Sequence, residues 1–122
     1  MLTLPSSVKI FVHTQPTDMR SGFDRLAMLA ETVMQADPLS GHLFVFFNKP
    51  ANKCKILFWD RTGFVLWYKR LEEGTFRLPR VRGEDASGEL KASELAMMLE
   101  GIDLKSIKRG KRFAVATKEQ NS

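Results

Sequence analysis

The stretch Leu43–Leu71 constrains the fold more than any other part of the chain. It holds three apolar runs separated by two polar breaks, and the runs are rich in β-branched and aromatic residues. Such residues suit a pleated surface that packs against other elements. Because the breaks are short and contain turn-forming residues, the pattern predicts an antiparallel β-meander whose strands are residues 43–47, 55–59 and 64–68.

The break Asp60–Gly63 predicts a register for the last two of these strands. Asp at its start and Gly at its end are typical of a type I turn followed by a left-handed glycine, which would place Asp60 opposite Phe64. One face would then carry the pairs Trp59 with Val65, Leu57 with Trp67, and Lys55 with Lys69. The other face would also be apolar near the turn. One helix can cover only one of these faces, so the other needs a later helix, a second subunit or a ligand.

The remaining chain predicts an α+β fold. Residues 8–12 form a strand pattern, and apolar residues at spacings of three and four predict a long helix from Asp18 to Gln35. Residues 72–88 lack periodicity and predict a loop, while Ser93 starts a short helix that stops at Gly101. We therefore expect a meander of about four strands with the long helix on one face, in a single domain of residues 1–104. Residues 105–122 should form a mobile basic tail.

The size and composition of the chain limit its class. A chain of 122 residues with 43% hydrophobic residues can bury one core without disulfides, and its one cysteine, Cys54, lies in a strand pattern as a small buried hydrophobe would. The longest apolar run has five residues, and no charged-then-apolar leader is visible. A membrane span needs roughly 20 apolar residues, so we expect a soluble, cytoplasmic protein that does not contact membranes.

The charge is concentrated in two blocks. Residues 49–82 carry a net charge of +6 and residues 101–122 carry +4, whereas the chain as a whole carries +5. Basic residues interleaved with aromatic ones favour a polyanionic partner such as DNA, although a solvated surface explains the same pattern equally well. The DNA-binding candidates are a hairpin strip and a basic arm in the tail: Lys55, Arg61, Lys69, Arg70, Lys105, Lys108, Arg109, Lys111 and Arg112.

No residue pattern indicates catalysis or metal binding. His13 and His42 stand without carboxylates or cysteines at metal-ligand spacing, and acidic residues near the start of the predicted helix favour its dipole. We therefore assign no catalytic residue, no metal ligand and no cofactor, and we expect a protein that is not an enzyme.

Several motifs together resemble a known family. They are Gln15-Pro16-Thr17-Asp18-Met19-Arg20, Leu43-Phe44-Val45-Phe46, Trp59-Asp60-Arg61-Thr62-Gly63-Phe64, Trp67-Tyr68-Lys69-Arg70-Leu71 and Gly101-Ile102-Asp103. The set is similar to the TnpB accessory protein of the bacterial insertion sequence sixty-six family, which is distinct from the RNA-guided nuclease of the same name. The resemblance implies a small protein, encoded beside a separate transposase, that assists transposition in a biochemical role the family does not settle.

Two hypotheses follow for its role. In the first, the protein is an accessory factor that binds DNA, at the element ends or without sequence preference, through the basic strip and the tail. In the second, it is an adaptor whose apolar hairpin face binds the transposase of the same element or a second copy of itself, with the interface residues Trp59, Trp67, Leu57 and Val65. Phosphate binding weakens steeply with salt and apolar burial does not, so salt dependence separates the two.

Overall fold

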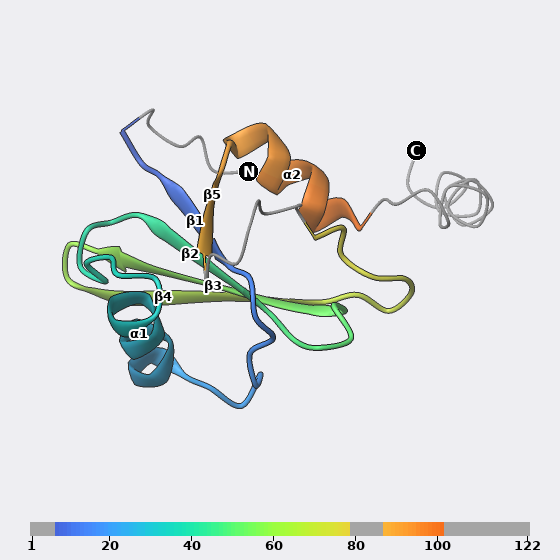
Figure 1. Ribbon diagram of the computed structural model, residues 1–122, viewed down its shortest axis with the longest axis horizontal. Coiled ribbons are helices and arrows are strands. Elements are labelled where there is room, and N and C mark those ends of the chain that lie inside the picture. Colours follow the sequence, from blue (N-terminus) through green and yellow to red (C-terminus); the bar gives the residue numbers. More distant parts are fainter. Residues whose placement is uncertain (1–6, 79–86, 102–122) are drawn as a thin grey trace.

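The computed structural model describes residues 7–78 and 87–101, and within them a five-stranded sheet has a helix on each face (Figure 1). The strands lie in the order β4-β3-β2-β1-β5. The elements in chain order are β1 (Ile10–His13), α1 (Phe23–Thr32), β2 (Leu43–Phe47), β3 (Lys53–Asp60), β4 (Gly63–Arg70), β5 (Ser87–Leu90) and α2 (Ala92–Glu100). The expected α+β class is confirmed.

The sheet is mixed, which corrects the expectation of an antiparallel meander of about four strands. β2, β3 and β4 do form the predicted antiparallel meander. β1, however, pairs with β2 in parallel, and α1 makes the crossover between them. A parallel neighbour needs such a long connection, which the segment from His13 to Leu43 provides. β5 adds a fifth strand, antiparallel to β1.

The two helices cover opposite faces of the sheet, and each face has its own core. On the face that we call the α1 face, Leu26 and Ala30 of the helix pack on Phe44, Phe46 and Leu57. The opposite α2 face is formed by alternate residues of the same strands, packed against α2: Leu43, Val45, Phe47, Cys54, Ile56, Leu95 and Met98. All five residues of β2 are buried, because this strand has a helix layer on both sides.

The predicted β3–β4 register is wrong by one residue. Asp60 pairs with Gly63, so only Arg61 and Thr62 connect the strands, and the left-handed residue is Arg61, at φ 45°, rather than Gly63. Trp59 therefore pairs with Phe64, Leu57 with Leu66, Ile56 with Trp67 and Lys55 with Tyr68. Side chains alternate between the faces of a strand, so this slip moves Trp67 and Lys69 to the α2 face, away from Trp59 and Lys55.

Helix α1 is shorter than predicted because its expected first turns form a loop. Asp18 accepts a hydrogen bond from the Arg20 backbone N–H, and the carbonyls of Met19 and Ser21 bind the Lys55 ammonium instead of continuing a helical ladder. Gly22 then becomes the N-cap. The short second helix and its left-handed C-cap Gly101, at φ 70°, are confirmed, but its N-cap is Lys91 rather than the predicted Ser93.

Strand β5 lies partly within the segment predicted as a loop. Its sequence, Ser-Gly-Glu-Leu, has little β-propensity, so pairing with β1 and burial of Leu90 at 7% exposure hold it in the sheet. The predicted domain boundary at residue 104 and the predicted tail lie outside the described residues. Among the described helices, none has the length and apolar character that crossing a bilayer demands.

Candidate nucleic-acid interface

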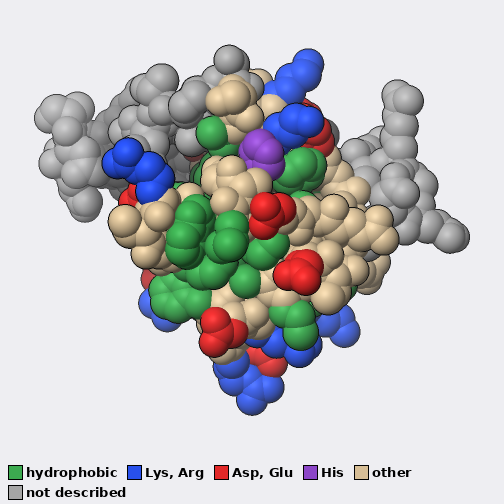
Figure 2. Space-filling model, turned by 90° about the vertical axis from the view of Figure 1, so that its left-hand side faces the viewer, with side chains coloured by type: hydrophobic (Ala, Val, Ile, Leu, Met, Phe, Trp, Pro, Cys, Tyr) green, Lys and Arg blue, Asp and Glu red, His purple; other side chains and the backbone are tan. Residues whose placement is uncertain are grey.

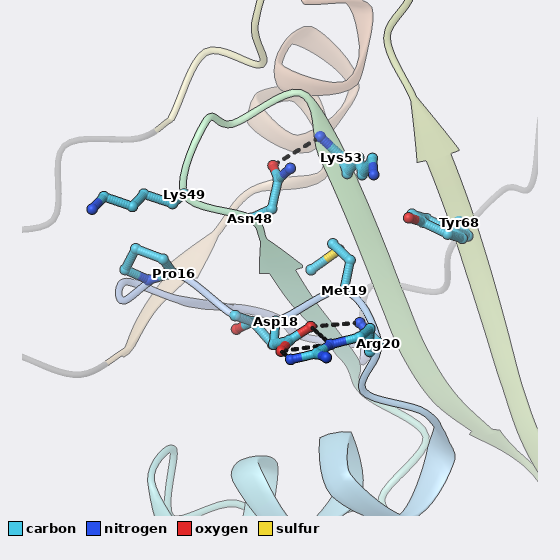
Figure 3. Close-up of a pocket in the computed structure, with 9 residues that line it drawn as sticks. Pro16, Asp18, Met19, Arg20, Asn48, Lys49, Lys53 and Tyr68 are labelled. Carbon is cyan, nitrogen blue, oxygen red and sulfur yellow. Dashed lines mark hydrogen bonds and ion pairs between the residues drawn. The ribbon is translucent and has the colours of Figure 1, made fainter.

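An open groove of about 550 Å³ lies between the loop that precedes α1 and the end of the β3–β4 hairpin opposite its turn (Figure 3). We call it the basic groove, and its lining comes from three segments: Pro16, Thr17, Asp18, Met19 and Arg20 of the loop, Asn48, Lys49 and Lys53 around the β2–β3 turn, and Tyr68 of β4. In the close-up, Lys53 and Tyr68 extend from neighbouring strands above the loop. The loop is the motif Gln15–Arg20 of the resemblance described above.

Asp18 and Arg20 form a compact turn at the floor of the groove. The carboxylate accepts the Arg20 backbone N–H at 2.8 Å, and it accepts the guanidinium through Nη2 at 2.7 Å and Nε at 3.1 Å. These side-chain and backbone hydrogen bonds from Arg20 lower the pKa of Asp18 to about 2. Both side chains are largely exposed, so the pair shapes the loop and leaves the guanidinium edge facing solvent.

Lys55 anchors this loop to the sheet. Its Nζ donates to the Met19 carbonyl at 2.7 Å and the Ser21 carbonyl at 2.8 Å, and it lies 4.7 Å from the centre of the Tyr68 ring. The side chain is only 7% exposed. Burial lowers the pKa of the Lys55 ammonium, and the negative charge of Asp18 opposes that shift. A charge in this position is retained because carbonyl oxygens and an aromatic face replace its water.

The β2–β3 turn supplies the lysines of the groove. The Asn48 side chain accepts backbone N–H groups from Asn52 and Lys53 and donates to the Asn52 side chain, and Ala51 adopts a left-handed φ of 57°. This bonding fixes the turn that presents Lys49. Within the described part of the chain, no hydrogen bond or ion pair engages the ammonium of Lys49 or Lys53.

Like charges meet at the rim of the groove. Lys53 pairs directly with Arg70 across β3 and β4, on the α1 face. Arg70 is bound by Glu72, through Nη2 at 2.8 Å, which raises the pKa of its guanidinium and leaves Lys53 without an acidic partner. Opposed like charges on a sheet are unfavourable by a few tenths of a kcal/mol, and a bound anion removes that cost.

Thr17, in the loop that lines the groove, carries a polar side chain that is buried. Its backbone N–H donates to Phe47 at 2.7 Å, but its buried hydroxyl has no hydrogen-bond partner among the described residues. An unsatisfied buried hydroxyl costs about 1–3 kcal/mol. Other contacts of the loop must offset this cost, and they include the two hydrogen bonds from the Lys55 ammonium to the loop carbonyls.

The structure does not assemble the predicted DNA-binding strip. Lys55 is buried under the loop, and Lys69 lies on the opposite face, where its Nζ donates to the Leu99 carbonyl at the end of α2. Arg61 is exposed at the β3–β4 turn, at the other end of the hairpin from Arg70. The tail candidates Lys105, Lys108, Arg109, Lys111 and Arg112 lie outside the described residues.

The four predicted interface residues are divided between the two faces. Leu57 is fully buried under α1, on the same face as Trp59, whereas Val65 and Trp67 lie on the α2 face with 38% and 39% of their surface exposed. The end of the molecule that carries the β3–β4 turn shows hydrophobic side chains gathered near its middle, with Lys and Arg towards the rim (Figure 2). Apolar side chains are therefore exposed at this end of the molecule, but the four predicted interface residues do not share one face.

The Cys54 thiol and the potential metal ligands bear separately on the question of catalysis. Burial raises the pKa of the Cys54 thiol to about 12, so it behaves as the small hydrophobe that its strand pattern predicted. Within residues 7–78 and 87–101, no three His, Cys, Asp or Glu side chains come together as a metal site would require.

Sequence reasoning missed the lysines that line the groove. Lys49 and Lys53 were counted in the +6 block, but nothing local separates them from other surface lysines. The available signal was their proximity to the Asn48–Asn52 turn, since such a turn displays its side chains. What joins them to the Gln15–Arg20 loop is a contact between segments about 30 residues apart, which no sequence periodicity reports.

Comparisons with known proteins identify one family and two relatives. The sequence model of the family described as IS66 Orf2 like protein matches residues 8–109. The chain is 34% identical over 102 residues to the uncharacterized protein y4jC of Sinorhizobium fredii, covering 84% of this chain and 86% of that protein. It is 35% identical over 103 residues to the uncharacterized protein y4hO of the same organism, covering 84% and 88%. No solved structure matches the chain.

Proposed function

This chain belongs to the family of IS66 Orf2-like proteins, and we propose that it assists transposition as a non-catalytic accessory protein that binds DNA. Membership of this family supports an accessory role associated with an insertion sequence. DNA binding and the transposase partner are our proposal: the first is supported by charge and geometry, and the second by the family.

The observation that carries the proposal is the pair of unengaged ammonium groups in the basic groove. Lys49 and Lys53 lie on one short segment, and Lys53 faces the like charge of Arg70. Phosphate oxygens would relieve this repulsion, and each phosphate contact releases condensed counterions from DNA. Contacts of this kind position a protein on DNA without reading its sequence.

Other basic residues extend the proposed contact. Arg61 and Arg70 are exposed and stay in the DNA-binding set, and the basic residues of the tail, which lie outside the described residues, join it. Lys55 and Lys69 contribute indirectly, because each donates to backbone carbonyls that hold the groove wall or the end of α2. Substituting Lys55 or Lys69 would therefore lower the stability of the fold as well as remove a positive charge.

A mobility-shift titration at two salt concentrations tests the proposal. Element-end and unrelated duplexes of equal length should bind with similar affinity, and both should weaken about fortyfold between 50 and 200 mM salt if about three phosphates are contacted. Affinity that does not fall with salt, or no binding to any DNA at low salt, would contradict it.

A second candidate function has its own observation. Val65 and Trp67 are exposed on the α2 face, and β4 is an edge strand. An exposed apolar edge of this kind favours an adaptor role, with the transposase or a second copy in a symmetric homodimer as partner. Sedimentation at tens of micromolar should then give a dimer mass that Trp67→Ser reduces to a monomer. A monomeric wild type that also fails to bind purified transposase removes this candidate.

A further inference from the structure

We propose that the basic groove binds unpaired DNA, with the Tyr68 ring stacking on a base and the ammonium groups of Lys49 and Lys53 contacting the flanking phosphates. The inference rests on the proposed DNA binding and assigns it to one form of DNA and one site. It is drawn from three features of the groove: its aromatic wall, its free cations and its size.

Tyr68 is built to serve as a stacking platform. The Lys55 ammonium lies over one side of the ring, 4.7 Å from its centre, yet the residue remains 50% exposed. In the close-up its side chain extends from β4 beside Lys53 and towards the loop (Figure 3). A fixed, half-exposed aromatic ring next to cations is the arrangement that single-strand binding proteins use to stack bases.

Several cations border the groove. Lys53 comes from the start of β3 and Lys49 from the preceding turn, so they border the groove along one side, and Arg20 lies on its floor. Asp18 is the acidic residue among the lining residues, and Arg20 already neutralises it at 2.7 Å. The groove is therefore positive where a phosphate backbone would pass.

The dimensions favour a single strand over a duplex. A volume of about 550 Å³ lies in the range of pockets that take one small organic molecule, so it admits about one or two nucleotides. The bases of a duplex are stacked on one another and cannot reach a side chain in the wall of such a groove. Tyr68 can thus contribute only to binding of an unpaired base.

Anisotropy titrations of the full chain with a twelve-nucleotide oligothymidine and a duplex of equal length test the inference. Tyr68→Leu should weaken single-strand binding about tenfold and leave duplex binding within twofold, while Tyr68→Phe, which keeps the ring, should bind like wild type. Phe23→Leu is the matched control, because Phe23 is a similarly exposed aromatic residue, at 47%, that lies outside the groove lining. Its single-strand affinity should not change.

A crosslinking experiment removes any dependence on how the variants fold. A bromouracil-containing strand irradiated with the wild-type protein should crosslink at Tyr68, and crosslinks at Trp59 or Trp67 in its place would overturn the inference. Equal loss of single-strand and duplex affinity in Tyr68→Leu would also overturn it. If wild type binds neither DNA in a salt-dependent way, the proposed function itself fails, whereas DNA binding that ignores Tyr68 refutes only the assignment to this groove.

Discussion

At the scale of single residues, Lys55 decides the geometry of the groove. Sequence reasoning placed it among phosphate contacts because it was expected opposite Lys69, in a strip of basic and aromatic residues. Its long apolar stem instead crosses the sheet surface, and its ammonium reaches carbonyls more than 30 residues away in sequence. Nothing in a lysine's own neighbourhood predicts such a contact, since it depends on where the Gln15–Arg20 loop folds.

Replacing Lys55 with Met should destabilise the protein by about 2–3 kcal/mol. The change keeps the apolar stem but removes two charge-assisted hydrogen bonds and leaves two loop carbonyls without their donor. Urea denaturation followed by tryptophan fluorescence measures the effect. Lys49→Met is the matched control, because that exposed side chain makes no bond in the described structure, and it should change stability by less than about 0.5 kcal/mol. Equal stability of the two variants would show that Lys55 does not anchor the loop.

The Asp18 carboxyl should titrate near pH 2. Its pKa is lowered in the folded protein, so its contribution to stability is complete above its ordinary pKa near 3.8 and is lost as the pH falls towards 2. Carbon-detected NMR titration of the carboxyl group gives the midpoint directly. Arg20→Gln should move the midpoint upward, towards 3.8, and Arg25→Gln should move it much less, because Arg25 acts only through a weaker charge interaction.

If Arg20→Gln leaves the titration midpoint of Asp18 unchanged, the hydrogen bonds between the Asp18 carboxylate and the Arg20 guanidinium do not form in solution. The loop would then lack the turn that Asp18 closes. The titration thus tests the floor of the groove without any assumption about DNA.

At the scale of elements, the strands of the meander and the second helix could be predicted because their signals are local. Apolar runs set β2, β3 and β4, and Gly101 marks the end of α2. The register could not be predicted, since both a two-residue and a three-residue connection fit Asp60–Gly63 and only packing selects between them. β5 was missed because its strand conformation comes from pairing with β1 rather than from its own residues.

Gly101→Ala should destabilise the protein by about 1–2 kcal/mol. The residue has a φ of 70°, where an L side chain is strained, and a Cβ there would lie 2.9 Å from Cδ1 of Leu71. Lys69 holds the same helix end through the Leu99 carbonyl, so the strain would loosen α2 against β4. Urea denaturation checks the loss.

Gly22→Ala provides the comparison at the start of the other helix. Gly22 has an extended backbone at φ −101°, and a Cβ there would meet no atom within 4 Å, so the change should alter stability by no more than about 0.5 kcal/mol. If the two alanine variants are equally stable, the left-handed cap does not restrain α2.

At the scale of the whole molecule, the fold class followed from the sequence but the candidate site did not. The alternation of apolar residues identified a packed sheet that needs cover on both faces, and helices α1 and α2 supply it (Figure 1). The groove arises where a loop, a turn and a strand meet, so its residues are close in space and scattered in sequence. The charge blocks indicated an anionic partner without indicating which lysines are free to meet it.

The whole-molecule account depends on those free lysines being the ones that contact phosphate. Charge spread evenly over the surface would produce salt-sensitive binding as well, but it would not single out Lys49 and Lys53. Lys9 and Lys91 are exposed and lie outside the groove lining, so a double substitution there removes the same charge from another part of the surface. Comparing the two double variants distinguishes binding at Lys49 and Lys53 from general attraction by positive charge spread over the surface.

The most direct test is the slope of log affinity against log salt concentration for an oligothymidine strand. We expect Lys49→Gln/Lys53→Gln to reduce the steepness of this slope by about 1.4, the value for two lost contacts to single-stranded phosphates. Lys9→Gln/Lys91→Gln should keep the wild-type slope. The same slope for wild type and Lys49→Gln/Lys53→Gln, or equal losses in both double variants, would contradict the account.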